Sequence, residues 1–154
     1  LGALKYFILK VDPRKNMIFN PAESIDFNGN TGSFIQYTYA RIKSVLKKAE
    51  KAGLTTDPSL IDQMKPGGKE IGLIKLIRKF HGVVVEAATA YSPAIIANYC
   101  YDISKEYNQF YHDCPIIGEE DVKIRNLRLS LSLVTSRVLS SGMWLLGVEM
   151  PERM

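Results

Sequence analysis

The spacing of apolar residues along this chain predicts helices, and no segment alternates between apolar and polar residues as a strand would. Apolar side chains recur every three or four positions over 33–52, 71–91, 93–111 and 124–141. This period matches the α-helix, so each segment is expected to bury one face. The predicted inward residues are Ile35, Tyr39, Ile42, Leu46 and Ala49; Leu73, Ile74, Ile77 and Phe80; Ile96, Tyr99 or Cys100, Ile103, Tyr107 and Phe110; and Ile124, Leu127, Leu131, Val134 and Val138.

Proline, glycine and capping residues predict where these helices begin and end. A helix over 3–11 is expected to stop before Pro13, because the residue ahead of a proline is pushed out of the helical region. A short helix is expected over 21–25, since Asn20-Pro21-Ala22-Glu23 combines a cap, a first-turn proline and an acid. Gly53 ends the first long helix, and Gly82 is expected to break the second.

The remaining boundaries complete an all-α bundle of five or six helices. A turn is expected at Asp57-Pro58 and a loop from Met64 to Gly68. Ser92-Pro93 can cap and start the next helix. The acids at 119–121 fit the start of the last helix, where the helix dipole favours negative charge.

Composition indicates one folded domain. The chain has 154 residues, of which 46% are apolar and 23% charged, enough to bury a full core. It contains neither a long apolar run nor a signal-peptide pattern, so we expect a soluble, cytoplasmic protein. Cys100 and Cys114 are expected to be reduced thiols, and His81 and His112 are too isolated to predict a metal site. Because the chain starts at Leu1 without methionine, it is expected to be an excised fragment that keeps its own carboxyl end.

Charge is distributed unevenly along the chain. Residues 41–80 contain ten Lys and Arg against four acids, a net charge of +6, whereas the whole chain carries +4. Lys43, Lys47 and Lys51 are spaced four apart and form a basic stripe on the first long helix. Such a surface suits RNA, because each neutralised phosphate releases counterions. A lysine-rich face that only contacts water is the alternative interpretation.

Aromatic and basic residues also occur together on that helix. Phe34, Tyr37 and Arg41 are three and four positions apart and share one side. Since Ile35 and Tyr39 already supply an inward face, this side is predicted to point away from the core. Single-stranded RNA is bound by stacking bases on aromatic rings and by basic contacts to phosphate. The alternative is that both rings belong to the core.

Several motifs together resemble a known family. They are Gly29-Asn30-Thr31-Gly32 with Phe34-Ile35-Gln36-Tyr37 and Ala40-Arg41, the terminal Met150-Pro151-Glu152-Arg153-Met154, and three stretches at 5–10, 108–115 and 145–148. In this order, they resemble the carboxy-terminal, DALR-type anticodon-binding domain of class I arginyl-tRNA synthetases. The resemblance extends over nearly the whole chain. It divides the chain into the tail of a catalytic domain with a connector, residues 1–28, and a helical anticodon-binding domain, residues 29–154.

This resemblance implies binding of the anticodon loop of arginine tRNA. The implied contacts are the side formed by Phe34, Tyr37 and Arg41, then Tyr111, then the terminal Met154. Tyr111 can stack on a base, and Met154 offers a thioether and a carboxylate. Ser33 replaces the usual proline, and residues 92–95 depart from the Asp-Ala-Leu-Arg pattern, so no role is assigned to those four.

The resemblance also implies a catalytic site outside this chain. The full-length enzyme is expected to use ATP and Mg²⁺ to join arginine to its tRNA. Both nucleotide signatures of the family, the His-Ile-Gly-His-like and Lys-Met-Ser-Lys-Ser-like motifs, are absent here. Gly67-Gly68-Lys69 lacks the spacing of a P-loop, and nothing indicates a hydrolytic triad. No catalytic residue or cofactor is therefore expected in the chain itself.

One other function class stays open on the sequence. The same aromatic and basic side could bind the acidic helix of a partner protein, which would make the chain a non-enzymatic interaction module. For either function we expect a monomer that contacts neither DNA nor a membrane.

Overall fold

The computed structural model describes residues 1–18, 20–57, 59 and 65–154, and these form six helices and no strand. The predicted turn at Asp57-Pro58 and the start of the predicted loop at Met64 lie partly outside the described residues. The predicted all-α fold is confirmed. The helices are α1 (Gly2–Leu9), α2 (Pro21–Ser24), α3 (Gly32–Lys51), α4 (Gly68–Thr89), α5 (Pro93–Asp113) and α6 (Val122–Leu145).

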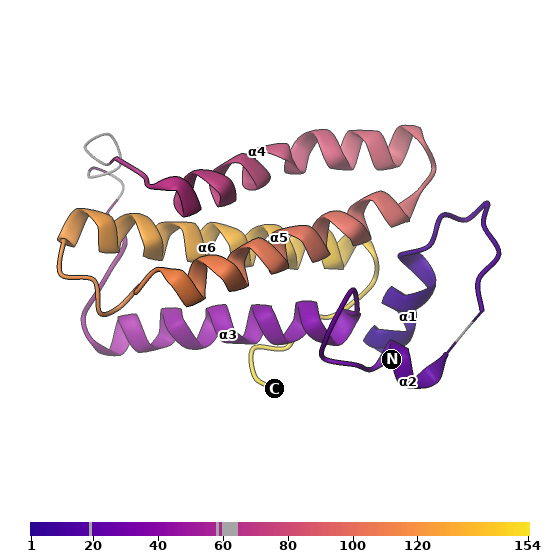
Figure 1. Cartoon of the computed structure of the whole chain (residues 1–154), viewed down its shortest axis with the longest axis horizontal. Coiled ribbons are helices and arrows are strands. Elements are labelled where there is room, and N and C mark those ends of the chain that lie inside the picture. Colours follow the sequence, from indigo (N-terminus) through magenta and orange to yellow (C-terminus); the bar gives the residue numbers. More distant parts are fainter. Residues whose placement is uncertain (19, 58, 60–64) are drawn as a thin grey trace.

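The four long helices are arranged in layers (Figure 1). Helices α5 and α6 form the middle, with α4 packed on one side and α3 on the other. Helix α1 packs at one end against α3 and α5. The core lies where these layers meet, because each helix turns its apolar stripe toward its neighbours. Its fully buried side chains include Ile35, Ile42, Leu73, Cys100, Ile103, Tyr107, Phe110, Leu139 and Met143.

Capping residues fix where the site-bearing helices begin. The Thr31 hydroxyl accepts a hydrogen bond from the backbone N–H of Phe34 at 3.1 Å and starts α3. Gly29, just before it, adopts φ +82°, a conformation that glycine tolerates best. Pro93 occupies the first turn of α5, as predicted. These local signals set where α3 and α5 begin.

Helix α1 is packed firmly on the bundle. The Tyr6 side chain is fully buried, and its hydroxyl donates to the backbone oxygen of Ala97 in α5 at 2.9 Å. Burial raises the pKa of Tyr6 well above its usual value, so the hydroxyl stays a donor. The division of the chain near residue 28 stays a prediction.

The predicted break at Gly82 is wrong. Helix α4 continues through Gly82 to Thr89. A glycine within a helix costs about 1 kcal/mol relative to alanine. Leu73 and Ala87, on either side of it, are buried against the middle layer, and this packing outweighs the local preference.

The predicted inward face of α6 is partly wrong. Leu127, Leu131 and Val138 are buried as predicted, but Val134 is exposed. Because α6 contacts α3, α4 and α5, its buried surface is wider than one amphipathic stripe. It takes in Leu129, Leu139, Met143 and several polar residues, namely Asn126, Ser132, Thr135 and Ser136.

Neither cysteine forms a disulfide. Cys100 and Cys114 are free and buried, and burial raises the pKa of Cys100 to about 12, which keeps it a neutral thiol. In the part of the chain that the structure describes, no helix is both long and apolar enough to cross a membrane, and no three His, Cys, Asp or Glu side chains form a metal-binding group.

Candidate functional site

Two tyrosines and an arginine from two helices meet at the surface. The Cζ atom of Arg41 in α3 lies 4.8 Å from the ring centroid of Tyr37 and 5.2 Å from that of Tyr111 in α5. Both distances fall within the range of a cation–π contact, about 6 Å. Tyr37 is 42% exposed and Tyr111 40%. We call Tyr37, Arg41 and Tyr111 the aromatic–arginine cluster; the structure thus joins residues that the sequence placed in separate motifs.

Buried and half-exposed rings support this cluster from beside and below. Tyr111 stacks on the fully buried Tyr107, with ring centroids 6.4 Å apart and an interplanar angle of 22°. Burial raises the pKa of Tyr107, and its neutral hydroxyl donates to Ser132 Oγ at 3.0 Å. Phe27 meets the Tyr37 ring edge-on, with centroids 6.3 Å apart. Tyr111 is therefore backed on one side by the core.

A chain of hydrogen bonds runs from Arg41 into the protein. Arg41 Nη1 donates to Asn108 Oδ1. Asn108 Nδ2 in turn donates to Thr38 Oγ1 at 2.8 Å, and the Thr38 hydroxyl donates to the backbone oxygen of Phe34 at 2.9 Å. Asn108 was not among the predicted RNA-binding residues, although it lies three positions before Tyr111 on the same side of α5. That spacing was the available signal, but the partner in α3 is 67 positions away.

The structure corrects the prediction for Phe34. Its side chain is half-buried against the core, with its ring centroid 5.6 Å from that of Tyr101 in α5. Because α5 packs against α3, this position faces a neighbouring helix as well as solvent. Phe34 therefore lies beside the cluster as a partly buried support, whereas Tyr37 and Arg41 keep the predicted outward side.

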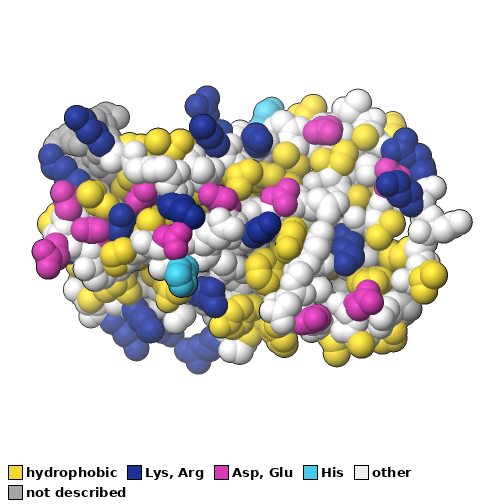
Figure 2. All heavy atoms as spheres, viewed as in Figure 1, with side chains coloured by type: hydrophobic (Ala, Val, Ile, Leu, Met, Phe, Trp, Pro, Cys, Tyr) yellow, Lys and Arg dark blue, Asp and Glu magenta, His cyan; other side chains and the backbone are white. Residues whose placement is uncertain are grey.

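Basic side chains follow the cluster toward the end of α3. Lys47, Lys48 and Lys51 are exposed. Figure 2 shows Lys and Arg side chains gathered along the lower left edge, where α3 ends. Lys43 differs, because its Nζ forms an ion pair with Glu152 Oε1 at 2.8 Å. The predicted stripe thus consists of two open lysines and one that is already paired.

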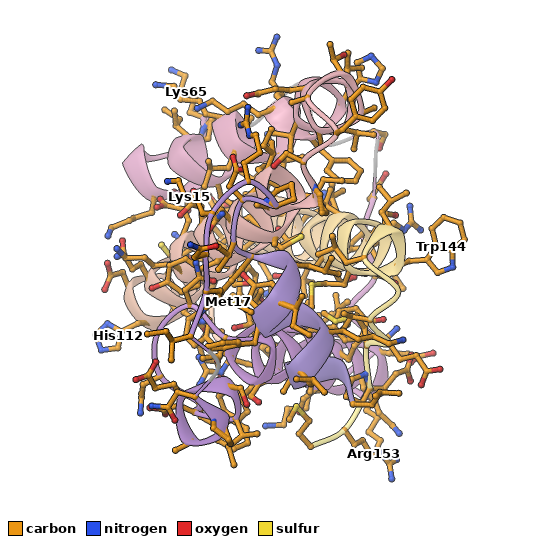
Figure 3. All side chains as sticks on the ribbon, turned by 90° about the vertical axis from the view of Figure 1, so that its right-hand side faces the viewer. Lys15, Met17, Lys65, His112, Trp144 and Arg153 are labelled. Atoms are coloured by element: carbon orange, nitrogen blue, oxygen red, sulfur yellow. The ribbon has the colours of Figure 1, made fainter. Side chains whose placement is uncertain are left out.

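The carboxy-terminal segment 147–154 lies along α1 and α3. Lys5 Nζ donates to the backbone oxygen of Gly147, and Gln36 Nε2 donates to that of Glu149, both at 2.7 Å. The end of this segment and the lysines of α3 together line a groove of about 610 Å³. Met154 is 59% exposed, and the neighbouring Arg153 projects from the base of the molecule in Figure 3.

A buried group of charged side chains has a structural role. Arg128 in α6 bonds to Glu70 Oε1 through Nε at 2.8 Å, and to Glu119 Oε2 and the Pro115 oxygen through Nη1, both at 2.7 Å. All three charged side chains are largely buried. This network attaches the 115–119 loop to α4 and α6, and Arg128 engages both of its carboxylates. The surface that remains open offers ring faces and cations, which suit stacking and phosphate binding.

Known proteins share the sequence and the fold of this chain. The arginine–tRNA ligase of Porphyromonas gingivalis is 59% identical over 154 residues, which cover 100% of this chain and 26% of that protein. The corresponding ligase of Bacteroides thetaiotaomicron is 58% identical with the same coverage. The solved arginyl-tRNA synthetase of Thermus thermophilus superposes with a TM-score of 0.89 at 31% identity, over 99% of this chain and 26% of that one.

The chain spans about a quarter of the length of these relatives. The family model described as the DALR anticodon binding domain matches residues 35–154, which include all of α3 but its first three residues, the whole of α4, α5 and α6, and every residue of the aromatic–arginine cluster. The match covers most of the chain, and the chain belongs to the DALR anticodon binding domain family.

Proposed function

We propose that this chain binds the anticodon loop of arginine tRNA as part of an arginine–tRNA ligase. Membership of the anticodon-binding family and the names of the relatives support the proposal. The observation that carries it is the aromatic–arginine cluster, in which two exposed rings and a guanidinium from different helices converge. Stacking of unpaired bases on such rings is the usual way in which proteins bind single-stranded RNA.

Each predicted residue has a specific part in this proposal. Tyr37 and Tyr111 stack on bases, and Arg41 donates hydrogen bonds to a base edge or a phosphate. Lys47 and Lys51 contact the RNA backbone, while Lys43 acts through its ion pair with the tail. Phe34 supports the rings from the side, and Met154 contributes a thioether at the exposed end of the tail.

We also propose that catalysis takes place outside these residues. The relatives are about four times as long as this chain, which lacks both nucleotide signatures of the synthetases. ATP and Mg²⁺ would then bind to another part of the whole ligase. The ligase would act in the cytoplasm, and this domain would be monomeric. The purified chain should give only background arginine-dependent pyrophosphate exchange. Robust exchange would mean that the active site includes residues of this chain.

A fluorescence titration tests the RNA-binding function. The chain is titrated with arginine tRNA, with a non-cognate tRNA, and with arginine tRNA whose anticodon bases are changed. We expect tighter binding of the unchanged arginine tRNA and a steep loss of affinity with added salt. Equal affinity for all three RNAs would refute anticodon recognition. An absence of RNA binding would favour the protein-interaction alternative.

A further inference from the structure

We infer that Asn108 is a positioning residue for RNA binding, which fixes the guanidinium of Arg41 within the aromatic–arginine cluster. The inference rests on the proposed function for its effect on RNA, and on the structure alone for its effect on Arg41. Nothing in the sequence motifs distinguishes Asn108 from a residue that contacts RNA directly. The hydrogen-bond geometry distinguishes the two roles, because it places Asn108 between Arg41 and the buried Thr38.

Arg41 needs such a partner because its side chain is long. A free arginine side chain samples many rotamers, and part of this freedom is lost whenever a ligand fixes it. Contacts with the Tyr37 and Tyr111 rings limit where the guanidinium lies. A cation–π contact does little, however, to fix the direction in which the N–H groups of the guanidinium point. The bond from Nη1 to Asn108 Oδ1 supplies the missing direction. Among the described residues, the guanidinium makes no other hydrogen bond, so its remaining N–H donors are available to a ligand.

The orientation of Asn108 is itself determined by the protein. The last acceptor in the chain of bonds is the backbone oxygen of Phe34, which can only accept. The Thr38 hydroxyl donates its one proton to that oxygen, so toward Asn108 it can only accept a hydrogen bond, which the NH₂ group of the Asn108 amide donates. Asn108 therefore presents its oxygen, and not its NH₂ group, to Arg41. Since Thr38 is fully buried, solvent does not compete for this arrangement.

Both ends of the Asn108 amide are thus engaged within the protein, which argues against direct contact with RNA. A direct contact and a positioning role predict different energetics. If Asn108 contacts RNA itself, its removal should weaken binding whether or not Arg41 is present. If it acts through Arg41, its removal should matter only while Arg41 is there, because affinity gained by pre-organisation disappears with the group that is organised.

A double-mutant cycle with arginine tRNA separates these cases. We expect Asn108→Ala to lower affinity about tenfold in the parent chain but less than about twofold in the Arg41→Ala background. Thr38→Val should give a smaller loss with the same dependence on Arg41. Asn98→Ala is the matched control, because Asn98 also lies in α5 and its side chain also forms hydrogen bonds, with the backbone oxygen of Ala94 and the side chain of Asn30, away from the cluster. Equal losses for Asn108→Ala in both backgrounds would overturn the inference.

A second measurement needs no RNA. In ¹⁵N NMR, the guanidinium signals of Arg41 should be resolved and slowly exchanging in the parent chain, and averaged in Asn108→Ala. Asn108→Asp keeps an acceptor oxygen in the same place and should therefore retain the resolved Arg41 signals. If the signals were averaged only because packing is lost, Asn108→Asp would average them as well. Thermal melting confirms that each variant is folded. Averaged Arg41 signals in the folded parent would refute positioning; resolved signals in a parent that binds no tRNA would refute only the proposed function.

Discussion

The Nζ atom of Lys43 lies 2.8 Å from Oε1 of Glu152, so an ion pair joins the end of the chain to the middle of α3. The hydrogen bond to Lys43 holds the pKa of Glu152 below its usual value, and the same bond raises the pKa of Lys43. The two residues carry full opposite charges at neutral pH. Lys43 is therefore partly neutralised before any RNA arrives, unlike Lys47 and Lys51.

This difference predicts how the lysines contribute to salt dependence. Replacing Lys47 and Lys51 together with Ala should flatten the slope of log affinity against log salt by up to about two units, because each phosphate contact releases roughly one counterion. Adding Lys43→Ala should change the slope little. The measurement is a tRNA titration at several salt concentrations.

The control for this prediction replaces Lys75 and Lys79, which are also exposed and four positions apart but lie on α4, across the bundle from α3. It removes the same charge from another face. If this control flattens the slope equally, the lysines of α3 act only through net charge and contact no phosphate.

Glu152→Gln should release the tail from α3. Because the folded-state pKa of Glu152 is lowered, the ion pair is present above the usual glutamate pKa and is lost as pH falls through the lowered value. The Met154 methyl signal in NMR should therefore sharpen when the parent is acidified below about pH 4. In Glu152→Gln it should already be sharp at pH 7.

Glu149→Gln serves as the control, since it removes a neighbouring charge while the backbone oxygen of Glu149 can still accept from Gln36. A Met154 signal that is equally sharp at pH 7 in the parent and in Glu152→Gln would show that the ion pair does not restrain the tail.

The sequence predicted what depends on short-range spacing. A local period and the cap at its start predict helix α3. The same period predicts which side chains point inward, Ile35 and Ile42, and which point outward, Tyr37 and Arg41. What it could not predict depends on neighbours far along the chain. Gly82 stays helical because α5 and α6 cover the residues around it, and Phe34 is partly buried because it packs against Tyr101 of α5.

The same limit applies to the site. Motif resemblance named Tyr111 but could not show that its ring contacts Arg41, nor that Asn108 bonds to both Arg41 and Thr38. Those contacts arise only when α3 and α5 pack at one particular rotation. Pairwise geometry between distant helices is the part of the site that a single sequence does not contain.

Tyr91 offers a test of backbone strain. It lies just after the end of α4 at φ +50°, in the left-handed region, where the N–H of Ser92 bonds to the oxygen of Ala87 at 3.0 Å. A side chain there costs roughly 1 kcal/mol, and Tyr91 gains little in return because it is 88% exposed. Tyr91→Gly should therefore raise the free energy of unfolding in urea by about 1 kcal/mol. Tyr91→Ala keeps the Cβ atom and should give no such gain; equal gains would mean that the ring, and not the backbone, is unfavourable.

Tyr111 is the most direct test of base stacking. Tyr111→Phe keeps the ring and should nearly keep the affinity for arginine tRNA. Tyr111→Ala should lose roughly 1–3 kcal/mol of binding free energy, the usual worth of one base on one aromatic ring. Tyr91→Ala is the matched control, because it removes a more exposed tyrosine that lies outside the cluster and should leave binding unchanged.

The packing of Tyr111 on Tyr107 makes a second readout necessary. Removing the ring also removes a contact with the core, so thermal melting must accompany each titration. If Tyr111→Ala melts like the parent but binds more weakly, the exposed face of the ring contacts RNA. If affinity and melting temperature fall together, Tyr111 acts mainly by holding the end of α5. If Tyr111→Ala melts and binds like the parent, the stacking surface does not include this ring, and Tyr37 becomes the remaining candidate in the cluster.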